Sequence, residues 1–345
     1  MIKMSITRFL SLLIVGITFS IKSFGVAPKD SLYYCAYQEI KSMLDGEKEL
    51  NLKRAVFLGE WAYLGDQLNY ESYSNTIESI RKPLTDFMVL NGLDKHPIGG
   101  NIALFEFFTN PSPLNGNRPY EYDFDDFGGK EDRTKLFVTK LMATHSGQCR
   151  SLPLFYKILA NEIGAEAFIA YAPNHSFIRH KSEEGDRLVC VELTNKTLPR
   201  EVYMIESMSI TETAIEKGTY MKPCDDREII IDLLVELAGN HFDEYGMSHF
   251  ALEVILQVLE YNPEQLRALF VLNNMLVTEG QKHRAHLNSL GLEGDEYLYT
   301  ILAELEYVHR TIDETGHVDM PAELYEEWVR SVQEEMERQK NNVSH

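Results

Sequence analysis

The spacing of apolar residues predicts helices over residues 28–82. Apolar side chains recur there at mixed helical spacings, as at Leu52, Val56, Leu58, Tyr63 and Leu64. Residues 83–130 are less regular, because prolines and several glycines interrupt the pattern. The prolines are Pro83, Pro97, Pro111, Pro113 and Pro119. We therefore expect residues 26–130 to form a helical N-terminal region that ends in proline-rich loops.

The central part of the chain changes from helical to strand-like periodicity. A helix is expected over 131–143 and an amphipathic helix over 150–163, where apolar residues recur at positions i, i+3, i+7 and i+11. Pro153 is tolerated in the first turn of that second helix, and Gly164 is suited to end it. Three strand candidates follow at 167–171, 175–178 and 187–193, with a turn-rich gap at 182–186.

Beyond residue 225 the pattern is helical almost to the end of the chain. Periodic apolar segments cover 226–245, 248–261 and 263–279, and two further helices are expected near 294–312 and 321–339.

The N-terminus has the composition of a secretory signal over residues 1–25. Lys3 and Arg8 are basic, residues 9–19 are mostly apolar, and small residues near Ser23 and Gly25 suit cleavage before Val26. The protein is thus expected to be exported, to the periplasm or the extracellular space. An uncleaved membrane anchor is the alternative, although the apolar run is short for a membrane span. No integral membrane segment is expected after cleavage.

Charge and cysteine content exclude several classes of protein. A formal net charge of −20 argues against binding nucleic acid or anionic lipid headgroups through bulk charge, so we expect no nucleic acid partner. The four cysteines are too few for a disulfide framework in 345 residues, although one bridge among Cys35, Cys190 and Cys224 stays open. The chain has no CxxC or HExxH motif, and we predict neither a metal site nor a cofactor.

Cys149 is the candidate nucleophile, because it stands at the expected start of the helix over 150–163. The N–H groups at a helix start favour a thiolate and can also hold an oxyanion during acyl transfer. Gly147 would let the backbone approach closely just before that helix. A lone cysteine in such a place is more often structural, so its role depends on whether a base and an orienting group lie beside it.

His175 is the candidate base and Glu192 the candidate orienting group, since a cysteine nucleophile needs a base and the base needs an acceptor. If their strands are antiparallel neighbours, the Glu192 carboxylate can meet the imidazole. Asn195 is the alternative orienting residue and His145 the alternative base. Gln148, Arg150 and Asn174 flank these residues and are candidates for contacts with the substrate or an oxyanion.

Residues 146–195 resemble the transglutaminase-like superfamily of papain-type cysteine hydrolases. The resemblance rests on Gly147-Gln-Cys149 opening a helix, on His175 at the head of a strand, and on Glu192 within Val-Glu-Leu-Thr-Asn195. It implies an α+β fold in which the cysteine helix packs on an antiparallel sheet over residues 131–222. It also implies Cys149 as nucleophile, His175 as base and Glu192 as orienter. Most members have Asp at the third position and many have Trp where Phe177 stands, so loss of activity is the alternative.

Residues 223–345 resemble tetratricopeptide repeats, as in a bacterial branch of that superfamily. Gly239, Phe242, Ala251 and Pro263 match the small, aromatic, small and proline positions of a 34-residue helical hairpin. One repeat on, Ala285 fits but Tyr297 replaces the proline. The small residues are expected to let paired helices pack closely. The resemblance implies docking of a protein partner, and a generic helical bundle is the alternative.

The sequence therefore supports two hypotheses of function. The first is an exported cysteine-dependent enzyme that hydrolyses a peptide or protein amide through a thioester on Cys149, with transfer to an amine as a variant. The second is an inactive scaffold that binds a protein partner through its helical repeats. The acidic, aromatic segment 120–127 would serve as a cleft wall or partner surface, or simply as a packed loop.

Overall fold

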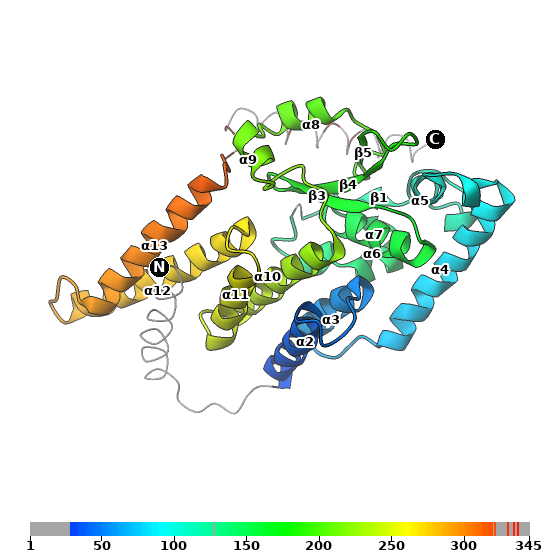
Figure 1. The fold of residues 1–345 in the computed structure, drawn as a ribbon. Helices are drawn as coiled ribbons and strands as arrows, with labels where there is room; N and C mark the ends of the chain where they lie inside the picture. Colours follow the sequence, from blue (N-terminus) through cyan, green and yellow to red (C-terminus); the bar gives the residue numbers. More distant parts are fainter. Residues whose placement is uncertain are drawn as a thin grey trace. The chain divides into compact units, whose positions relative to one another are not determined.

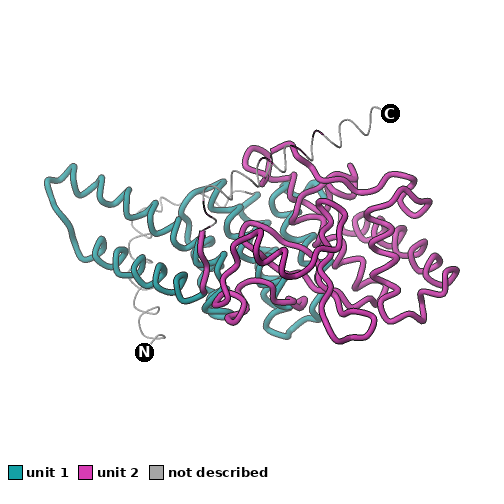
Figure 2. The backbone as a smooth tube through the Cα atoms, turned by 90° about the horizontal axis from the view of Figure 1, so that it is seen from above, with its two compact units in different colours: residues 1–68, 227–315 teal, residues 69–226, 316–345 magenta. Residues whose placement is uncertain are grey.

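A computed structural model describes residues 28–126 and 128–319, together with the isolated positions Pro321, Arg330, Glu334 and Glu337. The expected signal segment 1–25 and most of the expected helix 321–339 lie outside the described residues. The described part divides into two compact units, coloured separately in Figure 2. Unit 1 comprises the chain up to Leu68 and residues 227–315, and unit 2 comprises residues 69–226 with the chain from Gly316 onward.

Unit 1 is built from helices in both terminal parts of the chain (Figure 1). Its helices are α2 (Pro28–Leu44), α3 (Leu52–Leu64), α10 (Asp226–Tyr245), α11 (His249–Tyr261), α12 (Leu266–Ser289) and α13 (Glu296–Glu314). Within unit 1, α2 contacts α3, α11 contacts α12, and α12 contacts α13. The helical expectation for residues 226–314 is thereby confirmed, although α12 ends at Ser289, ten residues beyond the end of the 263–279 pattern.

An aromatic cluster joins the N-terminal helices of unit 1 to the C-terminal ones. The Tyr33 ring on α2 is buried edge-on against His241 at 5.1 Å and Phe250 at 6.1 Å between centroids. Arg227 also donates a hydrogen bond to the carbonyl of Leu44, and the Tyr261 hydroxyl donates to Asp45 at 2.6 Å. Residues 28–68 therefore share a core with 227–315, whereas the sequence suggested that they belong with the proline-rich loops.

Gly239 does not have the close-packing role expected of a small residue in a helical repeat. A Cβ added at this position would meet no heavy atom within 4 Å. Ala251 on α11 is fully buried, as that pattern requires. The close approach between α12 and α13 occurs instead at Gly280, where a Cβ would lie 3.3 Å from Ile301.

Unit 2 places helices against a small antiparallel sheet, so the chain as a whole has the expected α+β class. Helices α4 (Tyr70–Leu90), α5 (Gly99–Thr109), α6 (Val138–Thr144) and α7 (Ser151–Ile163) are followed by the sheet and by α8 (Glu201–Ser207) and α9 (Glu212–Glu216). Short 3-10 turns lie at Leu93–Lys95, Pro113–Asn115 and Arg133–Leu136. The helix expected over 131–143 is thus a 3-10 turn followed by the short α6.

The helix α4 runs through Pro83 to Leu90, although the sequence suggested that the irregular region begins at Pro83. A proline inside a helix removes one N–H donor, here the partner of the Ser79 carbonyl. Tyr73, Ile77 and Leu84 are buried on one face of α4, on both sides of the proline. Burial of this apolar stripe offsets the lost bond and keeps the helix continuous.

The three-stranded sheet has the order β3 (Phe168–Ala172), β4 (His175–Lys181) and β5 (Leu188–Val191), with both pairs antiparallel. Helix α7 packs on β3 and β4, and its apolar face from Leu152 to Leu159 is buried. Gly164, which caps the C-terminus of α7, has a φ of 72°, a left-handed conformation that glycine adopts without strain. The cysteine-bearing turn therefore lies just before the N-terminal start of a helix that packs on the sheet.

A second, parallel pair of very short strands precedes α7. Strand β1 (Glu121–Tyr122) lies beside β2 (Ser146–Gly147), so that Tyr122 is the register partner of Gly147. This pairing joins the acidic, aromatic segment to the residues just before Cys149. Among the described residues, none of the helices has the length and apolar character needed to cross a membrane.

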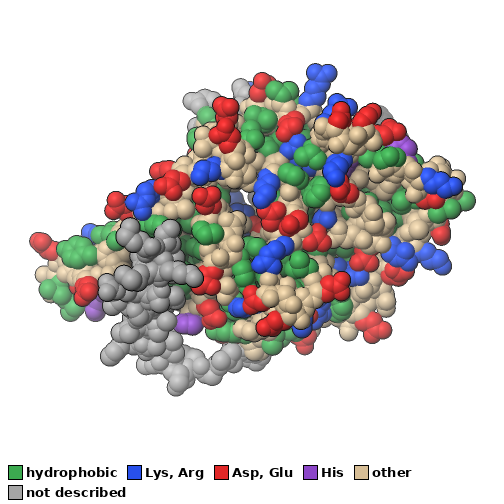
Figure 3. Space-filling view, in the orientation of Figure 1, with side chains coloured by type: hydrophobic (Ala, Val, Ile, Leu, Met, Phe, Trp, Pro, Cys, Tyr) green, Lys and Arg blue, Asp and Glu red, His purple; other side chains and the backbone are tan. Residues whose placement is uncertain are grey.

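On the face shown in Figure 3, acidic and basic side chains are interspersed with hydrophobic ones. The net charge of −20 does not gather into one continuous acidic patch on that face.

Candidate functional site

Cys149 lies in the tight turn between β2 and α7, and its side chain is partly exposed. Gly147 makes this turn feasible, because a Cβ there would lie 2.6 Å from the Ser151 hydroxyl and 2.7 Å from Leu141. The buried Ser151 hydroxyl in turn accepts the N–H of Gln148 at 3.0 Å. The backbone on each side of the thiol is therefore held, which limits the positions that the sulfur can take.

His175 reaches Cys149 from the first position of β4. Pro173 and Asn174 form the two-residue loop of the β3–β4 hairpin, and Asn174 has a φ of 55°. A side-chain hydrogen bond joins the imidazole to Cys149. The thiol sulfur also lies 4.0 Å from the carbonyl oxygen of Asn174. The Ser176 hydroxyl donates to the Cys149 carbonyl at 2.5 Å and ties the turn to the strand.

Glu192 meets the other side of the imidazole. It follows β5 directly, and its Oε2 lies 2.5 Å from Nε2 of His175. Its second oxygen accepts the N–H of Thr194 at 3.0 Å and the Thr194 hydroxyl at 2.7 Å. Because Nε2 faces the carboxylate, Nδ1 is left to face the thiol. The three side chains therefore form one line of hydrogen bonds.

The electrostatics of this line favour a charged histidine beside a charged glutamate. Burial opposes the protonated form of His175, but the Glu192 carboxylate and the bonds with Cys149 and Glu192 outweigh it and raise the pKa of His175 well above its ordinary value. Burial likewise opposes the charged form of Glu192, yet His175 and the two Thr194 bonds lower the pKa of this carboxyl. Each member of the pair therefore stabilises the charged form of the other.

The candidates for substrate and oxyanion contacts occupy different environments. The amide of Gln148 is buried and bonded to a loop, accepting from the N–H of Gly128 and donating to the Asp126 carbonyl, both at 3.0 Å. Arg150 is half-buried and immediately precedes α7. Asn174 presents its carbonyl to the thiol from the hairpin loop. The Gln148 amide is thus held by Asp126 and Gly128.

The two alternative partners have other contacts in the structure. The Asn195 amide oxygen accepts the Thr197 hydroxyl at 2.5 Å in the turn after Glu192. The His145 ring stacks on Tyr120 at 4.4 Å between centroids, and its Nδ1 lies 2.7 Å from the carbonyl of Arg118. His145 therefore does not replace His175 beside the thiol, and Asn195 does not replace Glu192 beside the imidazole.

Phe177 forms part of the support of the histidine. It is fully buried, and its ring lies nearly parallel to that of His175 at 6.3 Å between centroids. A phenyl ring offers no N–H, so this position contributes packing alone.

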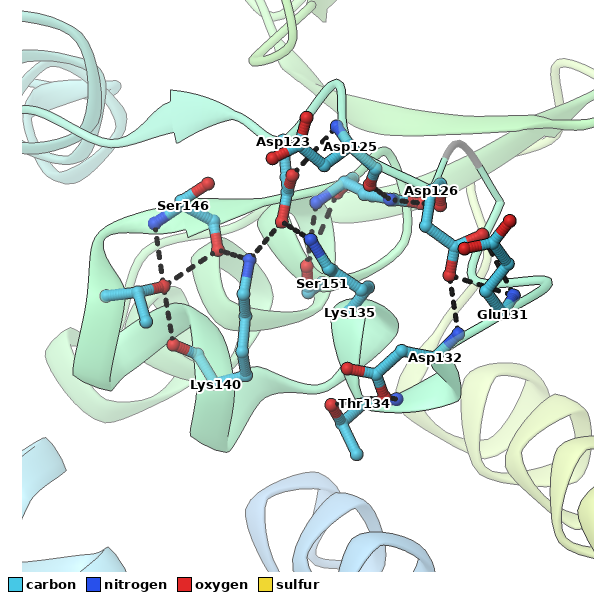
Figure 4. Close-up of polar contacts among 12 residues, drawn as sticks. Asp123, Asp125, Asp126, Glu131, Asp132, Thr134, Lys135, Lys140, Ser146 and Ser151 are labelled. Carbon is cyan, nitrogen blue, oxygen red and sulfur yellow. Dashed lines mark hydrogen bonds and ion pairs between the residues drawn. The ribbon is translucent and has the colours of Figure 1, made fainter.

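Figure 4 shows the polar contacts of Asp123, Asp125 and Asp126, which belong to the acidic, aromatic segment. The buried Asp123 carboxylate accepts a hydrogen bond from Lys140 and forms an ion pair with Lys135 at 3.4 Å. Lys140 also donates a hydrogen bond to the Ser146 carbonyl at 2.7 Å. Asp126 accepts the backbone N–H groups of residues 130–132. These contacts attach the segment to the backbone that leads into Cys149.

Three neighbours of the site had not been singled out from the sequence: Tyr122, Ser176 and Thr194. Tyr122 is buried, and Cys149 and Glu192 both act electrostatically on its phenol. Its position in the dense aromatic segment was the one signal available. Ser176 and Thr194 are ordinary strand and turn residues, and nothing in their spacing distinguishes them.

Among the described residues, no group of three or more histidine, cysteine, aspartate or glutamate side chains is arranged to hold a metal ion. None of the four cysteines takes part in a disulfide, so the bridge that the sequence left open is absent from the structure. No protein family model, no curated protein and no solved structure matches this chain.

Proposed function

We propose that this protein is an exported, cysteine-dependent acyl-transfer enzyme of the transglutaminase-like type, which hydrolyses an amide in a peptide or protein. One observation carries the proposal, namely the continuous line of Cys149, His175 and Glu192 side chains. A buried histidine between a thiol and a carboxylate has the arrangement of a nucleophile, its base and an orienting group.

The first half-reaction would use the thiolate of Cys149 against the amide carbonyl carbon. A C–S bond forms while the C=O π electrons move to oxygen, giving a tetrahedral intermediate. When the C–N bond breaks, the His175 imidazolium gives a proton to the departing amine. Glu192 stays ionised and stabilises the imidazolium without taking the proton.

The second half-reaction would release the acyl group from the thioester. Neutral His175 removes a proton from water, whose oxygen attacks the thioester carbonyl, and collapse expels the Cys149 thiolate. The products are the carboxylic acid and the enzyme with His175 protonated again. An amine in place of water would give crosslinking instead, and hydrolysis is the simpler proposal because it needs no second substrate.

The thiol reactivity of Cys149 tests this proposal against an internal reference. Cys35 is exposed and belongs to unit 1, so it reports an ordinary surface thiol in the same molecule. With iodoacetamide at about pH 6, Cys149 should label at least about tenfold faster than Cys35, because a thiolate is the reacting form. Peptide mass spectrometry measures both rates in one sample.

Two variants complete that experiment. His175→Ala should reduce labelling of Cys149 to about the rate of Cys35 and leave Cys35 unchanged. Cys149→Ser should abolish labelling by a probe that carries an electrophilic amide. Equal rates for the two cysteines in the wild type, with no effect of His175→Ala, would contradict an activated thiol.

A scaffold function of unit 1 is a second candidate, favoured by exposed apolar side chains on its helices. Tyr299 is 64% exposed and Leu302 43% exposed on α13, and Leu290 is 59% exposed after α12. Such residues suit docking of a protein partner, as tetratricopeptide-like repeats would provide. Under this function, Cys149→Ser would retain full activity in cells, whereas charged substitutions at Tyr299 and Leu302 would abolish it.

A further inference from the structure

Glu192 needs a second point of attachment to act on His175. It follows β5 directly, beyond the register of β4 and β5 that reaches Val191, so pairing with β4 does not hold it. A glutamate side chain has several rotatable bonds, and its backbone position alone does not aim the carboxylate. The Glu192 side chain is nevertheless buried, with Oε2 2.5 Å from Nε2 of His175. Contacts beyond the histidine therefore have to fix its direction.

The backbone of Glu192 is held by a short turn. Its N–H donates to the Thr197 carbonyl at 2.9 Å, and the Thr197 N–H donates to the Glu192 carbonyl at 3.0 Å. Lys196 in the same turn lies 2.6 Å from the Glu121 carboxylate on β1, which attaches the turn to a second strand. The turn is therefore held at both ends, and it places Thr194 beside the Glu192 side chain.

Thr194 provides two donors to one oxygen of that carboxylate. Its hydroxyl donates to Oε1 of Glu192 at 2.7 Å, and its N–H donates to the same oxygen at 3.0 Å. His175 contacts the other oxygen, Oε2. Because the two oxygens have different partners, the carboxylate cannot turn about its Cγ–Cδ bond without losing bonds on both sides. Thr194 thus sets the direction from which Glu192 meets the imidazole.

The charges of the site transmit this effect from Glu192 to the thiol. Burial raises the pKa of the Glu192 carboxyl, but His175 and then the two Thr194 bonds outweigh burial and lower it. Burial lowers the pKa of His175, and the Glu192 charge is the largest of the effects that raise it above its ordinary value. A side-chain hydrogen bond joins the same imidazole to Cys149. A change at Thr194 should therefore reach the thiol through Glu192 and His175.

We infer that Thr194 is a positioning residue of the proposed active site. It holds one oxygen of Glu192 so that the other stays on His175, and the imidazole held in this way keeps a proton beside Cys149 and favours the thiolate. Thr194 acts through Glu192 and not on the reacting atoms. This role rests on the proposed acyl-transfer function, because a thiolate is what that reaction requires of the site.

The pH profile of Cys149 alkylation by iodoacetamide tests this role. Thr194→Val keeps the shape of the side chain and the backbone N–H but removes the hydroxyl. At about pH 6 alkylation should slow about three- to tenfold, because one hydrogen bond to a charged group is lost and the imidazolium beside the thiolate is less favoured. At about pH 9 the rate should stay within about twofold of the wild type, because a thiol ionises there without a charged histidine. A damaged fold would slow alkylation at both pH values.

Two further variants serve as controls. Thr194→Ser retains a hydroxyl and should keep the profile within about twofold of the wild type. Thr134 has the same pair of contacts with another carboxylate, since its hydroxyl and N–H donate to Oδ1 of Asp132 at 2.7 and 3.0 Å. Asp132 is exposed at the start of a 3-10 turn, so Thr134→Val should leave the profile unchanged. Peptide mass spectrometry measures alkylated Cys149 at each pH, with Cys35 as the reference thiol in the same sample.

The outcomes distinguish the positioning role from the proposed function. An unchanged profile in Thr194→Val would overturn the positioning role, and so would an equal loss at both pH values, because the residue would then act on the fold. A similar loss in Thr194→Ser would overturn it as well, since the hydroxyl would not be responsible. If wild-type Cys149 reacts no faster than Cys35 at about pH 6, the acyl-transfer function itself fails, whatever the variants do.

Discussion

His175 illustrates how two neighbours can reverse the effect of burial on a side chain. Burial alone would keep its imidazole neutral, but Glu192 on Nε2 and Cys149 on the other side favour the charged form. Thr194 supports this arrangement by occupying the second oxygen of Glu192. The protonation state of one residue is thus set by contacts from three separate positions in the chain.

Glu192→Gln should therefore lower the pKa of His175. The main contributions that raise it come from the Glu192 carboxylate, and without that charge the effect of burial dominates. At pH 7 we expect the wild-type ring to be protonated on both nitrogens and the variant ring on only one. The ¹H–¹⁵N NMR spectrum of the His175 side chain measures this, and a ring still doubly protonated in the variant would contradict it.

The same pair predicts a window of pH in which Glu192 stabilises the fold. The lowered pKa of Glu192 gives stability that is complete above its unfolded value, about 4.3, and is lost as the pH falls through the folded value. The raised pKa of His175 gives stability that is complete below its unfolded value, about 6.5, and is lost as the pH rises through the folded value. Glu192→Gln should cost most between these limits, about 1–3 kcal/mol of unfolding free energy.

At the scale of elements, the start of α7 depends on a glycine that cannot be replaced without displacing its neighbours. Gly147 has both the Ser151 hydroxyl and the Leu141 side chain within 2.7 Å of where a Cβ would stand. Gly239, in the middle of α10, has open space at the same place. Replacement by alanine at these two positions therefore compares a crowded glycine with an uncrowded one.

Gly147→Ala should destabilise the protein by about 1–3 kcal/mol, because the added methyl group overpacks a filled turn. It should also slow alkylation of Cys149, since the Ser151–Gln148 bond that holds the turn would have to shift. Gly239→Ala should stabilise by about 0.5–1 kcal/mol, because alanine restricts the unfolded chain and fits a helix. Denaturant unfolding and the alkylation rate measure both effects, and similar results for the two variants would exclude the crowding argument.

At the scale of the whole molecule, the two compact units do not follow the order of the chain. The chain completes part of unit 1 by Leu68, forms unit 2, and returns to unit 1 at Arg227. Tyr33, Tyr37 and Phe250 are buried in unit 1, and Tyr33 and Phe250 come from opposite parts of the chain. The helices after 226 therefore need the helices before 68 to cover their apolar faces.

A fragment of residues 223–345 should for this reason be less stable than the same helices in the intact chain. Burial of one large apolar side chain contributes about 1.5–3 kcal/mol, so loss of the contacts from α2 should lower the melting temperature by about 10 °C or more. Circular dichroism measures the transition. Addition of a peptide of residues 28–68 should raise it, whereas a fragment that melts like the intact chain would support an independent C-terminal domain.

Local patterns in the sequence determined the kinds of elements and much of their order. The periodicity from Leu152 to Ile163 defined α7, and Gly164 defined its end. The order of a cysteine at a helix start, a histidine at a strand start and a glutamate expected within the next strand indicated the site, although that strand ends at Val191, just before Glu192. These features were readable because helical and strand periodicity, capping and turn chemistry act over a few neighbouring residues.

Only the tertiary structure decided which distant residues meet. It joined residues 28–68 to the C-terminal helices, placed Glu192 and not Asn195 on His175, and paired Tyr122 with Gly147. It also keeps α4 helical through Pro83, because burial of apolar side chains on both sides of the proline outweighs the lost backbone hydrogen bond. Such outcomes depend on packing between segments far apart in the chain, and no local pattern records which of several apolar faces will bury another.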